Sequence, residues 1–216
     1  SRYRLGFISP LILENTVDAE EIILPAETGG VEMTAMILPM DSNMPQEYLI
    51  LENRQKLGSD QYLEKSGLLV WHIDETITGM YPAINRVNVN PDFYGVNLLQ
   101  ADGEGDLYTC IISNCEDNGD PFPGSLGITR ITDSTNPSTN LYSYDRDVDG
   151  IIESGGNSNI GILNISENSD NSITFMVTNP NQLGKVLGYD EGGYDGISYS
   201  DSYSSLQWAG IRLIAQ

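Results

Sequence analysis

The sequence predicts a mostly β protein, made of antiparallel, sandwich-like sheets with long irregular acidic loops and little helix. Short apolar runs rich in β-branched and aromatic residues recur between turn residues, as at Tyr48–Leu51 and Gly67–Ile73. No window longer than about two turns has the spacing of an amphipathic helix. Glycine and proline are frequent, with 22 and 10 copies among 216 residues, and they separate the runs.

The predicted strands can be placed in chain order. Two pairs of them are expected to form hairpins, because a short turn-rich segment joins each pair: 20–24 with 31–38, and 159–165 with 172–177. We expect Tyr48–Arg54 and Gly67–Asp74 to lie together in one sheet. The full set is Arg4–Ile8, Glu20–Leu24, Val31–Leu38, Tyr48–Leu51, Gly67–Ile73, Val96–Gln100, Asn159–Ile165 and Ser172–Val177.

Two longer segments have no core pattern. Thr76–Phe93 is expected to be irregular, and Asn114–Asn140 is the longest stretch without a predicted element. A segment of that length in a compact domain must be held in place, and the nearby cysteines or a bound ion are the expected ties. The composition changes after Pro180. Residues 1–178 are therefore predicted to be one β-rich domain, and 179–216 a Gly/Tyr/Asp-rich linker with the start of a following β element.

The charge balance is strongly acidic. The formal net charge is −21, from 31 acidic and 10 basic residues. Nucleic acid is not expected as a partner, because phosphate binding needs clustered Lys and Arg. No apolar run reaches the roughly 18 residues of a membrane span, so no span is expected either. Two explanations of the acidity remain open: solubility in a salty medium, or several calcium-binding loops of an extracellular protein.

The chain has two cysteines, Cys110 and Cys115. Neither has a neighbouring His or a second Cys pair, which argues against a zinc knuckle. In a secreted protein they would form one local disulfide, and the alternative is two free buried thiols.

The clearest metal-binding pattern is DRDVDGIIE. Its carboxylates Asp145, Asp147, Asp149 and Glu153, with a glycine at position 150 for the turn, resemble the first half of a calcium loop. The alternative is an acidic surface turn. Three weaker patterns of the same composition are Asp102–Asp106, Glu116–Asp120 and Tyr189–Asp195.

Charged residues also end the two central strands. Glu52 and Arg54 share one face of their strand, and His72 and Asp74 share one face of theirs. Charge at the end of a buried strand must be paired or must face a cleft. We expect the four residues to form one network that supports or lines an active-site cleft. The alternative is a purely structural ion network, with His72 held by a carboxylate or a backbone carbonyl.

Several stretches resemble, in the same order, the C-terminal part of the catalytic domain in the immune inhibitor A family of secreted zinc metallopeptidases. They are SRYRLGFISP, ENRQ, GLLVWHIDE, GVNLLQADGEGDL, DNGDPFPGS and NIGILNIS with SITFMV. The resemblance implies a secreted, extracellular hydrolase in which a zinc-activated water and a glutamate base cleave peptide bonds.

The zinc motif of that family, HExxH, is absent, and His72 is the only histidine. The resemblance therefore implies a scaffold portion of such a peptidase, with no catalytic residue and no zinc of its own, inert alone. Its expected partners are the rest of the parent protease and a protein substrate. The alternative is a non-enzymatic extracellular calcium-binding β module, used for surface binding or assembly.

Overall fold

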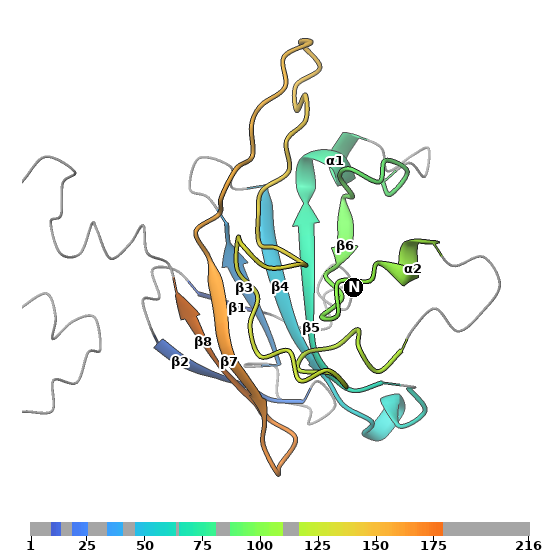
Figure 1. Cartoon of the computed structure of the whole chain (residues 1–216), viewed down its shortest axis with the longest axis vertical. Helices are drawn as coiled ribbons and strands as arrows, with labels where there is room; N and C mark the ends of the chain where they lie inside the picture. The colour runs from blue at the N-terminus through green and yellow to red at the C-terminus, as the bar shows by residue number, and fades with distance from the viewer. Residues whose placement is uncertain are drawn as a thin grey trace, which may run out of the picture.

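The computed structural model describes residues 10–13, 19–25, 34–40, 46–63, 65–80, 87–109 and 117–178, and these form two β-sheets with little helix (Figure 1). The predicted mostly β, sandwich-like fold is confirmed. The predicted strand Arg4–Ile8, the cysteine pair Cys110 and Cys115, and the tail 179–216 lie outside the described residues.

The larger sheet has the order β1-β3-β4-β5-β6. Its long central strands, β4 and β5, are antiparallel over their whole length, so the predicted pairing of these segments is confirmed. β1 pairs with β3 in parallel, and the other neighbours are antiparallel. The bounds are β1 (Leu11–Ile12), β3 (Ala35–Pro39), β4 (Glu47–Arg54), β5 (Gly67–Asp74) and β6 (Val96–Leu98).

The smaller sheet has the order β2-β8-β7 and is antiparallel throughout. It contains β2 (Ala19–Ile23), β7 (Gly161–Glu167) and β8 (Ile173–Thr178). The predicted hairpin at the C-terminal end of the domain is thus confirmed as β7 and β8.

The predicted hairpin of 20–24 with 31–38 is wrong. β2 pairs with β8 in the smaller sheet, with Ile23 opposite Ile173, whereas β3 pairs with β4 in the larger one. Adjacent strands pair only as a tendency. Here the pairing with β8 leaves Ile23 fully buried in the core between the sheets.

The core lies between the two sheets. Side chains of β4 and β5 that point to one face, such as Leu49, Leu51, Leu68 and Val70, form one apolar cluster with Phe175 and other residues of the smaller sheet. Side chains that point to the opposite face of the larger sheet form a separate cluster: Ile37, Tyr48, Ile50 and Ile73, with Trp71 against it. The alternation of the strands thus determines which charged residues face the core.

A buried amide joins the sheets. Asn53, fully buried in β4, donates from Nδ2 to the carbonyl oxygens of Ile23 (3.1 Å) and Asn171 (2.8 Å). These bonds connect the end of β4 to β2 and to the turn between β7 and β8. Because both acceptors are main-chain groups, the register of the two sheets is tied to one side chain.

Helix occurs only in short pieces among the described residues: η1 (Gly58–Asp60), α1 (Glu75–Met80) and α2 (Asp106–Thr109). α1 begins at Glu75 and continues into Thr76–Phe93, which the sequence predicted to be irregular. Asp74 explains its start, because the Asp74 carboxylate accepts the Thr76 and Ile77 N–H groups at 2.9 and 3.3 Å.

The long segment after residue 117 is held by buried side chains and isolated bridges. The main-chain N–H and carbonyl groups of Phe122 exchange hydrogen bonds with those of Leu68 in β5. Ile131 forms the same pair of bonds with Ile162 of β7. The carboxylate of Asp133 accepts bonds from Thr139, Ser158 and Asn159 at 2.8–3.1 Å. Apolar anchors and one carboxylate therefore tie this segment down.

Candidate functional site

Three charged or titratable side chains meet at one end of the β4–β5 pair. The register places Glu47 opposite Asp74 and Leu49 opposite His72. Because Leu49 points into the core between the sheets, these three side chains point to that same face. All of them are buried, with Glu47 and Asp74 at 0% exposure.

Glu47 is the acceptor at the centre of this group. Its Oε1 accepts from His72 Nε2 at 2.8 Å and from the Tyr142 main-chain N–H at 2.7 Å. Its Oε2 accepts from the guanidinium of Arg146 at 2.5 Å. An ionised carboxylate only accepts, so His72 carries its proton on Nε2 in this bond.

Asp74 is the second carboxylate. Its Oδ1 caps α1, and its Oδ2 accepts from the Tyr144 hydroxyl at 2.7 Å and from Arg146 Nη1 at 2.9 Å. Both oxygens are therefore satisfied, as a fully buried carboxylate requires.

Arg146 joins the two carboxylates. Its two terminal nitrogens bond to Glu47 and Asp74 separately, and Nη2 also donates to the Tyr142 carbonyl oxygen at 2.8 Å. The guanidinium lies 4.5 Å from the centre of the Tyr144 ring. We call Glu47, His72, Asp74 and Arg146 the buried ion network.

An aromatic stack continues from the buried ion network. The His72 and Tyr142 rings are stacked, with centroids 4.2 Å apart and planes 5° apart. The Tyr142 hydroxyl accepts from Asn97 Nδ2 of β6 at 2.9 Å. His72 is thus fixed by Glu47 at its edge and by Tyr142 on its face.

The buried ion network makes stability depend on pH. Burial by itself raises the pKa of Glu47, but the His72 bond and charge, the Tyr142 N–H and Arg146 outweigh burial and lower it. A lowered pKa stabilises the fold above the unfolded-state value of about 4.3, and this contribution is lost as the pH falls through the folded-state value.

We therefore expect Glu47→Gln to destabilise the protein at pH 7. The difference in stability between wild type and variant, which we call the gap, should become smaller in acid. Urea midpoints measured at a series of pH values for wild type and variant give this gap. Glu104→Gln, an exposed carboxylate in a turn, is the matched control. A gap of equal size at every pH would contradict the role given to Glu47.

Glu52 and Arg54 do not belong to this network. They lie at the other end of β4, where Arg54 is opposite Gly67, and on the opposite face from Glu47. Arg54 pairs with Glu52 at 3.3 Å, as expected, and also with Asp60 of η1. The prediction that the four residues form one network is wrong, because antiparallel pairing places the ends of consecutive strands at opposite ends of the sheet.

A pocket lies beside the buried ion network. It has a volume of about 450 Å³, and His72 and Tyr142 form part of its wall. The side-chain amide of Gln100 lies in this wall, 2% exposed, with neither polar atom bonded to the described residues. Most polar groups of the wall are neutral, notably Asn97, Gln100, Tyr108, Asn140 and Tyr142.

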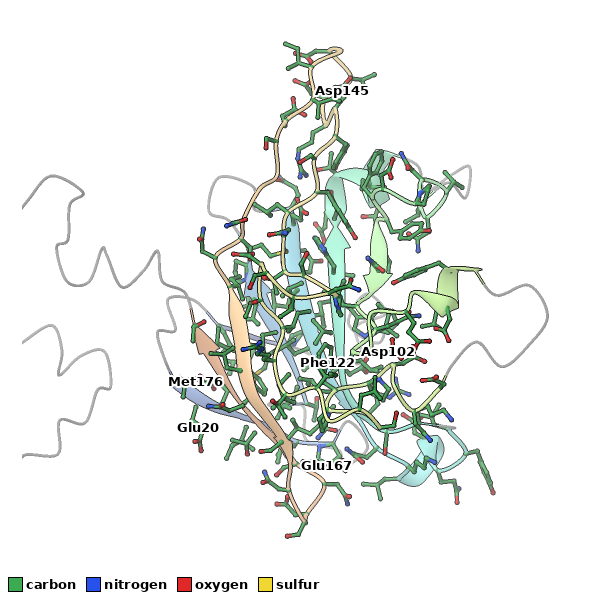
Figure 2. The ribbon with its side chains drawn as sticks, viewed as in Figure 1. Glu20, Asp102, Phe122, Asp145, Glu167 and Met176 are labelled. Carbon is green, nitrogen blue, oxygen red and sulfur yellow. The ribbon has the colours of Figure 1, made fainter. Side chains whose placement is uncertain are left out.

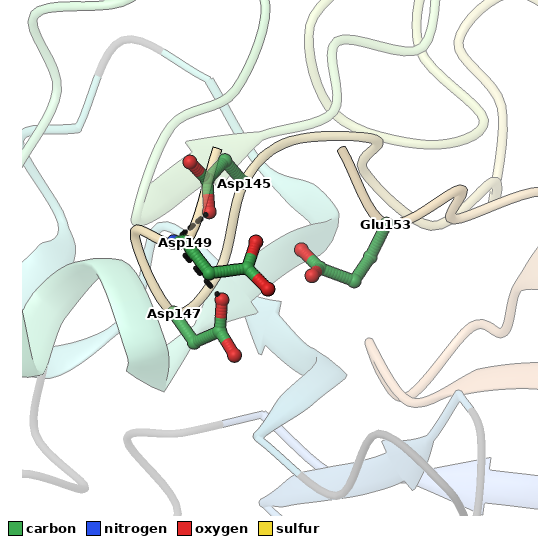
Figure 3. Close-up of side chains that lie close together, drawn as sticks. All are labelled: Asp145, Asp147, Asp149 and Glu153. Atoms are coloured by element: carbon green, nitrogen blue, oxygen red, sulfur yellow. Dashed lines mark hydrogen bonds between the residues drawn. The ribbon is translucent and has the colours of Figure 1, made fainter. Parts of the chain in front are cut away.

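The predicted metal-binding residues come together. Ligand oxygens of Asp145, Asp147, Asp149 and Glu153 all lie within 4.8 Å of one another, so this group can hold a metal ion (Figure 3). Residues 144–153 form a turn closed by a bridge between Tyr144 and Glu153, which we call the acidic hairpin. It projects beyond the sheets, with Asp145 near its end (Figure 2).

Main-chain donors organise the acidic hairpin. Asp145 accepts from the N–H groups of Asp149 and Gly150 at 3.1 and 2.9 Å, and Glu153 accepts from that of Arg146 at 2.7 Å. Each carboxylate oxygen has a second lone pair for an ion. Arg146 stands between Asp145 and Asp147 and joins this turn to the buried ion network.

The structure describes only some of the residues in the three weaker acidic patterns. Asp102 and Asp106 lie near Asp117 and Asp120, whereas Glu116 and Tyr189–Asp195 lie outside the described residues. Burial, together with the charges of the neighbouring aspartates, raises the pKa of Asp120 to about 6, and a bond from the Asp117 N–H opposes this rise.

Sequence reasoning missed Glu47, Tyr142, Tyr144 and Arg146. One signal was present, because Arg146 is the only basic residue between Arg130 and Lys185, within an acidic run. A lone cation among acids is a candidate partner for buried carboxylates. Its actual partners depend on contacts between residues 72 and 99 positions apart, which no local pattern indicates.

No protein-family model, curated protein or solved structure matches this chain. In the part of the chain that the structure describes, no helix is long and apolar enough to cross a membrane.

Proposed function

We propose that this chain is the β-rich scaffold portion of a secreted zinc metallopeptidase of the immune inhibitor A kind, and that the pocket beside His72 receives part of its protein substrate. The ordered sequence stretches that resemble that family support the proposal. The structural observation that carries it is the contact between the buried ion network and an open pocket whose polar wall groups are mostly neutral.

The chemistry of the pocket suits a peptide. A peptide group presents one N–H donor and one carbonyl acceptor, and side-chain amides offer the complementary pair. Asn97 and Asn140 line the pocket together with Tyr142. A bound peptide would find partners there without placing a charge in a buried site.

The role proposed for the buried ion network is positioning. Glu47 and Arg146 hold His72 and Tyr142 in one orientation, and these two rings form part of the pocket wall. Rings fixed before binding lose little conformational freedom when a substrate arrives. This arrangement supports a stiff cleft wall, with His72 as a positioning residue.

The residues of this sequence do not fit a zinc site of the family's kind, because only one histidine is present. The zinc-binding residues would come from another segment of the parent protein. That segment would supply the zinc-activated water and the general base of peptide hydrolysis.

The complete reading frame that contains this chain tests the proposal. We expect it to encode HExxH before the SRYRLGFISP stretch, and the whole protein to hydrolyse casein. Asp92→Trp, at the exposed rim of the pocket, should lower kcat/KM by about tenfold or more by obstructing the substrate.

Leu126→Trp adds the same bulk at a position that is 63% exposed and does not line the pocket, so it is the control. A reading frame without HExxH would overturn the peptidase proposal. A peptidase that tolerates Asp92→Trp as well as Leu126→Trp would overturn the role of the pocket alone.

The acidic hairpin favours a second candidate, an extracellular calcium-binding β module for surface binding or assembly. Its carboxylate oxygens suit calcium, a hard cation that takes oxygen ligands. Three aliphatic side chains stand among them, with Val148, Ile151 and Ile152 at 72%, 65% and 70% exposure. Apolar groups gathered at the end of a projecting turn are typical of a contact surface.

Calcium removal tests this candidate. Calcium at a hundredfold excess over its Kd stabilises a protein by about 2.7 kcal/mol through binding linkage, so chelator should lower the melting temperature. Asp147→Asn/Asp149→Asn should remove the part of this response that arises at the acidic hairpin. If the double variant responds to chelator as wild type does, the acidic hairpin is only a turn.

A further inference from the structure

The pocket beside His72 has a buried amide in its lining that the protein leaves without a partner. Gln100, two residues after β6, lines this pocket and is 2% exposed. Neither its side-chain nitrogen nor its side-chain oxygen forms a hydrogen bond within the part of the chain that the structure describes. A buried amide with both ends unsatisfied costs stability, because it has given up its bonds to water. Gln100 therefore points to a partner from outside the described chain.

Asn140 adds a third unsatisfied atom. It belongs to the long segment after residue 117 and lines the same pocket. Its Nδ2 donates to the Asp133 carbonyl oxygen at 3.1 Å, which sets the orientation of its amide. Its Oδ1 is buried and accepts no hydrogen bond from the described residues. Gln100 and Asn140 together therefore leave two acceptor oxygens and one donor nitrogen unused.

The other side-chain amides of the pocket wall already have partners. Asn97 donates to the Tyr142 hydroxyl at 2.9 Å, and Asn136 donates to a main-chain carbonyl oxygen at 3.1 Å. Of the described residues that line the pocket, Gln100 and Asn140 are those with amide atoms both buried and unbonded. A ligand that enters the pocket gains most by satisfying these atoms, since their desolvation is already complete.

We infer that the pocket binds a primary carboxamide, the side chain of a glutamine or asparagine in the protein substrate, at Gln100 and Asn140. A carboxamide carries two N–H donors on one nitrogen and one carbonyl acceptor. Its nitrogen would donate to the side-chain oxygens of Gln100 and Asn140, and its oxygen would accept from the Gln100 nitrogen. This match uses all three unsatisfied atoms. The inference rests on the proposed function, because it names the substrate side chain that the pocket takes.

The same atoms disfavour side chains of similar size. A carboxylate only accepts hydrogen bonds, so it would bring negative oxygens against the two unused acceptor oxygens. Asp92, exposed at the rim of the pocket, adds a negative charge that also repels a carboxylate. An aliphatic side chain would leave all three atoms unsatisfied. A site built to hydrogen-bond a group rejects analogues that lack it, so the pocket should be selective for the carboxamide.

Three small probes test this inference on the full chain, and the test needs no peptidase activity. The probes are the N-acetyl methylamides of glutamine, glutamate and methionine, which share the same two peptide groups and have side chains of similar length. Binding to the ¹⁵N-labelled chain is measured from the changes in its amide chemical shifts during titration. We expect the glutamine probe to bind at least about tenfold more tightly than either of the others.

Two buried glutamines form a matched pair of variants. Gln100→Met removes the unsatisfied amide, so it should raise the melting temperature by about 2 °C or more and abolish the preference for the glutamine probe. Gln55 is 3% exposed and does not line the pocket, and its Nε2 donates to Asn53 Oδ1 at 3.0 Å. Gln55→Met removes a satisfied amide, so it should lower the melting temperature and keep the preference.

Equal binding of the three probes would overturn the carboxamide inference and leave the pocket as a general peptide site. Absence of binding by all three would overturn the inference as well. A Gln100→Met variant that is less stable than wild type, or that keeps the preference, would show that this amide is structural. Selective binding of the glutamine probe by a chain whose reading frame lacks HExxH would support the carboxamide site and overturn the peptidase proposal alone.

Discussion

Arg146→Met is expected to destabilise the protein by about 3–5 kcal/mol, because it leaves two buried carboxylates without their cation. Glu47 and Asp74 are 0% exposed, and the Arg146 side chain is 14% exposed. Methionine keeps much of the aliphatic length, so the loss reports the charge and its hydrogen bonds more than the packing. Urea unfolding at pH 7 gives the free energy difference directly.

Arg130→Met is the control, because Arg130 is exposed and should change stability by less than about 0.5 kcal/mol. The triple change Arg146→Met/Glu47→Gln/Asp74→Asn should recover part of the loss, since it removes the unpaired charges as well. If Arg146→Met costs no more than Arg130→Met, the carboxylates of the buried ion network are not held as described.

Phe122→Ala is expected to have an effect of similar size, about 3–5 kcal/mol, because it removes a fully buried aromatic ring from the core between the sheets. Phe122 also carries the reciprocal main-chain bonds that join its segment to Leu68 of β5. Urea unfolding measures the loss of stability.

Two further variants make the Phe122 result interpretable. Phe122→Leu keeps most of the volume and should cost less than about 1.5 kcal/mol. Leu126→Ala, in the same segment but 63% exposed, should be close to neutral. Equal losses for Phe122→Ala and Leu126→Ala would show that Phe122 is not a core anchor.

The parts of the fold that local patterns predict are those built from neighbouring residues. Short apolar runs located β4 and β5, and the turn between 165 and 172 located the β7–β8 hairpin. The short acidic spacing of DRDVDGIIE brought its four carboxylates together, because residues two apart in one tight turn cannot be far from one another.

The parts that local patterns could not predict depend on tertiary pairing. β2 pairs with β8 and not with β3, the next strand in the sequence. Arg146 forms ion pairs with Glu47 and Asp74, which are distant from it in the sequence. The sequence also predicts that Glu52 and His72 belong to one network, because each lies near the end of its strand. Antiparallel pairing places these two strand ends at opposite ends of the sheet. Charge at a strand end indicates that a partner exists, and only the topology identifies that partner.

The pairing of β2 with β8 has a consequence for how the protein forms. These strands come from opposite ends of the described chain, so β2 emerges from the ribosome long before its partner. The larger sheet can begin to assemble from β3, β4 and β5, whose contacts are closer in sequence, while β2 waits unpaired. While it is unpaired, β2 exposes Ile22 and Ile23 and an open strand edge. It can therefore pair with the wrong strand or with another chain during synthesis. We therefore expect refolding to be slow, with yield that falls as protein concentration rises, and closure of the smaller sheet to be the last step.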